Sequence, residues 1–544
     1  MMNKFFQAQT SNFVHFALPS PASLRHAALG LCLAGGVLGG GISLFAQAPK
    51  GETAKGATPA TPPAATTPAT GATPPAGDAS PEKFSAKNLL ANDVADADTP
   101  QYQKVNEAIA KFLARDLEGA RKLLSEAKTA FPKLPPEEVM LARLLAAANA
   151  APAARAELEQ AVRTAPTDPE AYVLFGQIAL SERRVTDADC ILDRAGKLIE
   201  TYSDNPIRKA TLQKAYLSAR ALVAENRKQW GEAKQHLDAW IAMDPSSKES
   251  APHTRLGAVL FQLGKLKESW ESFNKAATLD KNAISPNLAI AMMYEQRKDP
   301  LTSQMDVKEA KKAFELALKE DPALNKERLL RSHILATQWA IAKNDLDYAK
   351  AVSSKALTID PASQDAQLQA AILARFTRDL DRAEKLLDDL HDRYPGNFQV
   401  ANQLALVLAE QNDANKRRRG AELAQLTFNA NNKQGTQPQL LGEALTAVAV
   451  TQYKLGNIQE AARILQQLAN NNALNSDSAY YVARILADSS KNLEALNILE
   501  KALSEPVFVN KKDAQELFES LKKKVESDGP GNAPKSDTSK ASGK

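Results

Sequence analysis

Residues 169–196 read PEAYVLFGQIALSERRVTDADCILDRAG, and this stretch decides the fold. It contains two runs of helix-length apolar periodicity separated by a short polar break. The first run carries Tyr172, Phe175 and Gly176, and the second carries Ala188, Leu192 and Ala195. The stretch therefore predicts two helices joined by a short turn.

The small and large residues of the second run recur at a fixed period. Three ladders step by 34 residues: Ala120, Ala154 and Ala188; Leu124, Leu158 and Leu192; and Ala127, Ala161 and Ala195. Pro132 and Pro166 close two of the units. A fixed period of about 20–50 residues indicates a stacked array of similar units rather than one globular core.

The unit resembles the tetratricopeptide repeat, with its large–large–Gly first helix and its Ala–large–Ala second helix. The resemblance implies an all-α fold, a right-handed superhelical α-solenoid of antiparallel helix pairs with about eleven repeats. Small residues would let the helices approach, while Phe175 and Leu192 would fill the space between them. The residues predicted to pack the repeats are Gly176, Ala188, Ala195, Gly257, Ala276, Ala349, Ala383, Ala461 and Ala495.

The repeats are expected to span residues 101–506, followed by a capping helix in residues 507–526 and a disordered tail in residues 527–544. The capping helix is predicted over Lys511–Val525, which carries an apolar face. The spacing between repeats lengthens at three places, where insertions or longer helices are expected. These are Tyr202–Pro206, Lys298–Val307 and Asn412–Arg419.

The N-terminus predicts export. Arg25 and His26 precede the apolar run Ala27–Ala46, and Ala46-Gln47-Ala48 follows, so residues 1–48 form a signal peptide or an N-terminal membrane anchor. Pro49 disfavours cleavage, and the glycines of the run disfavour a membrane-spanning helix, so both alternatives stay open. Leu29–Cys32 is a weaker match to a lipoprotein signal. Residues 49–100 are predicted to be a disordered Pro/Ala/Thr-rich linker.

Composition and motifs disfavour several functions. The chain has 68 basic and 64 acidic residues, and this near balance gives no broad positive surface for nucleic acid. It has six histidines without metal-ligand spacing and two cysteines, of which only Cys190 lies in the array. We find no phosphate-binding loop and no nucleophile motif. The sequence therefore predicts no enzyme, no catalytic residue, no metal site and no cofactor.

The basic run Lys416–Arg419 is the densest charge in the chain. It could bind an anionic partner, but it lacks interleaved aromatic residues. A solvated insertion between helices is the favoured interpretation.

The resemblance also implies a partner-binding groove on the concave face, lined by the first helix of each repeat. Carried over to this sequence, the groove residues are Arg143, Gln177, Leu288, Met292, Ile334, Gln338, Leu368, Ile372 and Arg484. Lys and Asn do not stand at the positions that clamp a C-terminal carboxylate in this family. The central part of the groove is instead apolar, and it either receives a partner segment or packs against neighbouring helices.

These features predict a non-catalytic scaffold of the cell envelope, periplasmic or membrane-anchored, that binds protein segments in its groove. The alternative is a membrane-tethered structural spacer, held through Ala27–Ala46, that associates with copies of itself.

Overall fold

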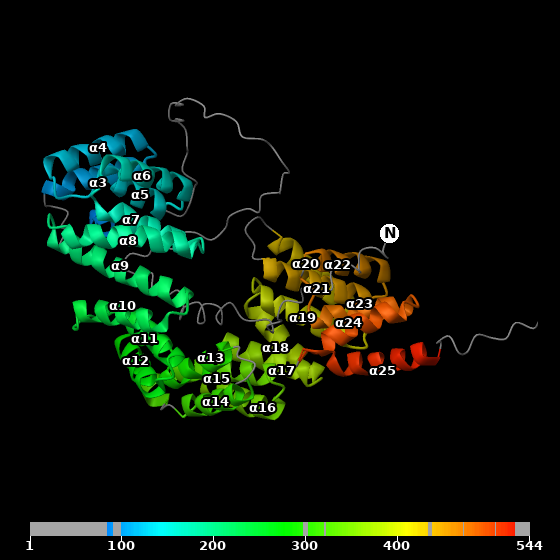
Figure 1. The fold of residues 1–544 in the computed structure, drawn as a ribbon. Helices are drawn as coiled ribbons and strands as arrows, with labels where there is room; N and C mark the ends of the chain where they lie inside the picture. The colour runs from blue at the N-terminus through cyan, green and yellow to red at the C-terminus, as the bar shows by residue number, and fades with distance from the viewer. Residues whose placement is uncertain are drawn as a thin grey trace, which may run out of the picture. The chain divides into compact units, whose positions relative to one another are not determined.

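The computed structural model describes residues 84–90, 100–297, 303–319, 322–432, 438–471, 473–505 and 507–527. Every regular element in these ranges is an α-helix, and α3 to α24 follow one another as eleven consecutive pairs (Figure 1). The predicted all-α array of helix pairs is therefore confirmed. The chain divides into an N-terminal unit, which contains the described residues up to Ala310, and a C-terminal unit that starts at Lys311.

Helices α2 to α14 lie in the N-terminal unit, apart from the end of α14, which crosses into the second unit. Their bounds are α2 Ala86–Leu90, α3 Pro100–Leu113, α4 Leu117–Ala130, α5 Glu137–Ala147, α6 Ala151–Thr164, α7 Pro169–Ser181, α8 Val185–Thr201, α9 Pro206–Asn226, α10 Trp230–Met243, α11 Ala251–Gln262, α12 Leu266–Leu279, α13 Pro286–Gln296 and α14 Ser303–Ala317.

Helices α15 to α25 belong to the C-terminal unit. Their bounds are α15 Pro322–Ala342, α16 Leu346–Ile359, α17 Gln364–Phe376, α18 Leu380–Arg393, α19 Phe398–Glu410, α20 Ala414–Asn431, α21 Pro438–Lys454, α22 Ile458–Asn470, α23 Ser476–Asp488, α24 Asn492–Leu503 and α25 Lys511–Ser527.

The turn inside a pair has one recurring geometry. Nine pairs have a residue with left-handed backbone after the first helix: Arg115, Asn149, Arg183, Lys228, Gly264, Asn344, Arg378, Gly456 and Ser490. In each, the N–H of the following residue donates to a carbonyl five residues back, at 2.8–3.0 Å. This is the Schellman motif at the end of a helix. The chain reverses its direction there, so that the second helix runs antiparallel to the first. The second helix begins two residues after the left-handed residue.

A small buried residue stands five positions after each of these nine left-handed residues. The set is Ala120, Ala154, Ala188, Ala233, Ser269, Ala349, Ala383, Ala461 and Ala495, and each is at most 2% exposed. Ala310 and Gly420 occupy the matching place in the two remaining pairs. The ladder read from the sequence thus marks the line along which paired helices touch.

Two glycines of the first helices show how close this approach is. A Cβ added to Gly176 would come within 2.7 Å of the Leu192 side chain, and one added to Gly257 within 2.8 Å of the Phe273 ring. Real Cβ atoms do not come this close, so the large residue of the second helix occupies the space that glycine leaves. Ala195 and Ala276 are likewise buried, at 0% and 2% exposure.

The structure corrects the expected linker at residues 49–100. Within it, α2 forms a helix, and Ala86 and Leu89 are buried against the first repeats. Predictions for residues 1–83 and 528–544, including the signal or anchor, lie outside the described residues. The helix expected over Lys511–Val525 is α25.

The expected lengthening at Tyr202–Pro206 appears as two long helices, since α8 has 17 residues and α9 has 21. The basic run near residue 416 is different from what was expected. It lies inside α20 rather than in an insertion between helices, and it pairs with α18. Lys416 lies 2.6 Å from Glu384 and Arg419 lies 2.7 Å from Asp388, so two of its charges hold neighbouring helices together.

Among the described helices, none combines the length and the apolar character needed to cross a membrane.

The left-handed turn gives a test of the fold. Gly264 has φ +76°, so Gly264→Ala should lower the free energy of unfolding by about 1 kcal/mol, because a Cβ disfavours this backbone. Gly231 lies in α10 with nothing near its missing Cβ, and Gly231→Ala should raise stability by about 0.5 kcal/mol. Urea unfolding of the two variants measures both values. Equal effects of the same sign would contradict the role of the turn.

Candidate functional site

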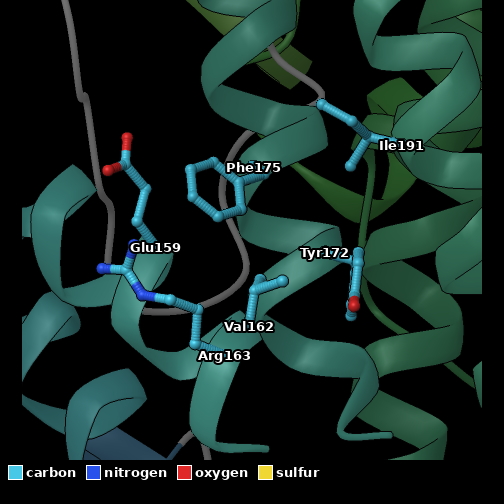
Figure 2. A pocket seen from close by; sticks show the side chains of 6 residues that line it. All are labelled: Glu159, Val162, Arg163, Tyr172, Phe175 and Ile191. Atoms are coloured by element: carbon cyan, nitrogen blue, oxygen red, sulfur yellow. The ribbon is translucent and has the colours of Figure 1, made fainter. Parts of the chain in front are cut away.

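A hollow in the described surface lies between α6, α7 and α8. It encloses about 370 Å³ and is lined by Glu159, Val162, Arg163, Tyr172, Phe175 and Ile191 (Figure 2). Four of these six side chains are apolar or aromatic, and all four are partly exposed. Surface of this kind favours the insertion of an apolar side chain from another molecule.

Charged groups stand only at one side of the hollow. Glu159 and Arg163 come from α6 and lie beside Phe175 in Figure 2, while Ile191 and Tyr172 line the opposite side. The Tyr172 hydroxyl donates to the carbonyl of Pro166, at 3.3 Å, which fixes the ring at the edge. The hollow therefore has an apolar floor with one polar edge.

The hollow does not lie on the face that the sequence predicts for binding. Phe175 and Gln177 are two residues apart on α7, which places them on nearly opposite sides of the helix. Gln177 is exposed on the predicted face, and Phe175 lines the hollow on the other.

The predicted apolar centre of the groove is not an open surface, which bears on the two alternatives that the sequence left open. Its five members pack against neighbouring helices with 0–9% exposure: Leu288, Met292, Ile334, Leu368 and Ile372. Ile334, for example, lies in a cluster with Ala356 and Ala366. The alternative that these residues pack within the array is the one the structure supports.

The polar members of the predicted groove lie in three different settings. Gln338 is 8% exposed, and neither end of its amide has a hydrogen-bond partner in the described part of the chain. Arg484 on α23 is partly buried. Arg143 donates to the carbonyl of Leu89, at 2.6 Å, and also pairs with Glu170, at 2.5 Å. The structure does not bring these residues together at one site.

Arg143 belongs to an ion-pair network that joins three successive repeats. Glu170 is buried between Arg143 and Arg208, and Arg208 also binds Asp168 at 2.7 Å. Burial alone would raise the pKa of Glu170, but the two guanidinium groups outweigh it and hold that pKa below its ordinary value. The network contributes to the coupling between repeats.

A second polar cluster lies in the C-terminal unit and joins α17, α19 and α25. Arg375 pairs with Glu410, at 2.5 Å, and both side chains are nearly inaccessible. Arg378 reaches the start of α25, where its guanidinium lies 3.1 Å from the side-chain oxygens of both Asn510 and Asp513. The first helices of this unit are thereby tied to its last helix.

The described residues contain no group of three or more His, Cys, Asp or Glu side chains that could hold a metal ion. His333 is buried, with Nδ1 3.0 Å from the carbonyl oxygen of Leu329, and burial lowers its pKa. Cys190 is exposed on α8.

Comparison with known proteins identifies the repeat. A family model of the tetratricopeptide repeat matches residues 139–191, which span α5 to α8 and enclose the hollow. The match supports the resemblance to the tetratricopeptide repeat that the sequence shows. No curated protein matches the sequence.

Solved structures of several tetratricopeptide-repeat proteins resemble it distantly. Yeast Tom70 is 15% identical, with a TM-score of 0.33 over 80% of this chain and 98% of that one. A tetratricopeptide repeat protein from Parabacteroides merdae is 16% identical, with a TM-score of 0.29 over 57% and 99%. Pseudomonas aeruginosa pilF is 15% identical, with a TM-score of 0.27 over 38% and 95%.

Tetratricopeptide-repeat proteins generally mediate interactions between proteins. Two structural features of this chain, the hollow and helix α2, were not predicted from the sequence. Phe175 was expected to fill the space between helices and Tyr172 was noted only as a signature residue of the repeat, and no pattern shows that both stay partly exposed. Helix α2 could have been predicted from three large apolar residues near the end of a segment that is otherwise poor in them. These are Phe84, Leu89 and Leu90.

The buried network predicts a pH dependence of stability. Because the folded pKa of Glu170 lies below the unfolded value of about 4.3, its stabilisation is present above that pH and lost as the pH falls through the folded pKa. Glu170→Gln should cost about 3 kcal/mol at pH 7 and flatten the loss of stability between about pH 5 and 3. Urea unfolding across this range measures both.

The matched control is Glu159→Gln, on the exposed face of α6, which should change stability by less than about 0.5 kcal/mol. If Glu170→Gln and the wild type lose stability in parallel on acidification, Glu170 does not carry the predicted linkage.

Proposed function

We propose that this protein is a non-catalytic scaffold that binds other proteins, and that the hollow between α6, α7 and α8 receives an apolar side chain of a partner. The observation that carries the proposal is the hollow of about 370 Å³ lined by partly exposed Val162, Phe175 and Ile191. Such side chains gain free energy when another apolar surface covers them, at about 25 cal/mol per Å².

We further propose that the scaffold works in the cell envelope. Arg25, the apolar run Ala27–Ala46 and Ala46-Gln47-Ala48 support export, followed by release or retention as an anchor. Residues 49–80, rich in Pro, Ala and Thr, would then separate the repeats from the membrane.

A charge placed in the hollow tests the proposal. Ile191→Arg should abolish binding of partners, because an arginine there fills the apolar space and cannot be desolvated cheaply. The matched control is Gln177→Arg, on the exposed opposite side of α7, which should leave binding unchanged. The measurement is photo-cross-linking in living cells, from a cross-linking residue placed at Val162, in each background.

Discrete cross-linked products that persist in the Gln177→Arg background and disappear in the Ile191→Arg background support the proposal. Thermal unfolding of both variants shows that the repeats remain folded. If the products are the same in both backgrounds, partners do not use the hollow.

A further inference from the structure

The short helix α2 lies against the first helices of the first two repeats, α3 and α5, on a site that holds it at both ends. At its beginning, the N–H of Ala86 donates to the side-chain oxygen of Asn106, at 3.2 Å. At its end, the carbonyl of Leu89 accepts from Arg143, at 2.6 Å. The first N–H groups and the last carbonyls of a helix lack partners within it, and this site supplies one partner to each end.

The charge of the site and its apolar contacts also suit helix α2. The C-terminal end of a helix carries partial negative charge, which favours a guanidinium such as that of Arg143. Between the two ends, Ala86 and Leu89 are 3% and 6% exposed and join the core cluster of the first repeats. The Phe84 ring lies 6.0 Å from the ring of Phe112. We call the site formed around Asn106, Phe112 and Arg143 the berth.

The occupant is held by the berth and not by its own stability. Helix α2 has five residues, and isolated helices shorter than about 12–15 residues are marginal in water. Its release would leave no charge unpaired, because Arg143 retains Glu170 and Asn106 is only partly buried. The energetic cost of emptying the berth is therefore mainly the exposure of a few apolar side chains.

We propose that the berth is a docking site for a partner protein that presents a short helix with the pattern Phe-x-Ala-x-x-Leu-Leu, and that residues 84–90 occupy it until such a helix displaces them. The inference rests on the proposed scaffold function and adds both a partner class and its regulation. The resident segment shows what fits: one and a half turns of helix, with a free N–H at one end and a free carbonyl at the other. A tethered competitor lowers the apparent affinity of the partner, so only a matching helix displaces it.

The probe is a fluorescein-labelled peptide with the sequence of residues 82–92, and the protein is the full chain. In the Leu89→Asp variant the resident segment is released and the berth residues are unchanged. Fluorescence anisotropy should show saturable binding to this variant that is at least tenfold tighter than binding to the wild type. Adding Asn106→Ala to the Leu89→Asp variant should weaken binding of the peptide about fivefold, because one hydrogen bond to the peptide is lost. Leu113→Ala, at an exposed position of α3, is the matched control and should change nothing.

Displacement is measured on the wild type. Excess unlabelled peptide should speed hydrogen exchange of residues 84–90, while a peptide carrying Asp in place of its leucine at position 89 should not. Circular dichroism checks that each variant is folded, and Ala86→Glu empties the berth by a second route if Leu89→Asp does not fold.

Three outcomes would overturn the proposal. Equal affinity for the wild type and Leu89→Asp would mean that the resident segment does not compete. No binding to a folded, emptied berth would mean that it accepts no helix from outside. Concentration-dependent dimers of the wild type that are lost in Leu89→Asp would mean that the occupant is a second copy of the chain. None of these outcomes affects the Ile191→Arg test, because the berth and the hollow share no residue.

Discussion

The contact between the two helices of each repeat is the constraint on which the rest of the structure depends. A left-handed residue ends the first helix, and five residues later a small side chain is buried against that helix. The two features always occur together in the nine pairs that have such a turn. The turn fixes the direction of the second helix, and the small residue fixes its distance. The geometry inside each repeat follows from these two features.

This constraint is costly, and the packing must compensate for the cost. Seven of the nine left-handed residues are not glycine, and each such residue costs about 1–2 kcal/mol compared with right-handed backbone. The cost is offset because the second helix then buries its apolar stripe along its whole length. At Gly420 the second helix approaches the backbone of the first, since an added Cβ would lie 2.7 Å from the carbonyl oxygen of Ala405. Helix pairs therefore keep their geometry even where the spacing between repeats changes.

Contacts within a helix pair could be predicted from the sequence, whereas contacts between repeats could not. The alanine ladder was visible because contacts within a pair are local and recur at fixed offsets. Ser269 was overlooked as a member of that ladder, although it is fully buried and its hydroxyl donates to the carbonyl of Gly257 at 2.7 Å. Which residues stay open depends instead on the stagger between repeats, which the offsets do not record. The offsets therefore left open whether Leu288 lines a groove or is packed, and it is packed; Phe175, which was expected to pack, is partly open.

Each of the two units is contacted by a flanking helix, but the two contacts differ in kind. At the C-terminal end, α25 buries Leu517 and Leu521 in a large core cluster, and Asn510 lies between Asp477 and Arg378. Removing α25 would expose the end of the stack of helices, as expected for the terminal cap of a repeat array. At the N-terminal end, α2 adds only five residues, and full burial of a residue such as Leu89 contributes about 2 kcal/mol. A contact of that size is small enough for a competing segment to replace, whereas the contact of α25 is part of the fold.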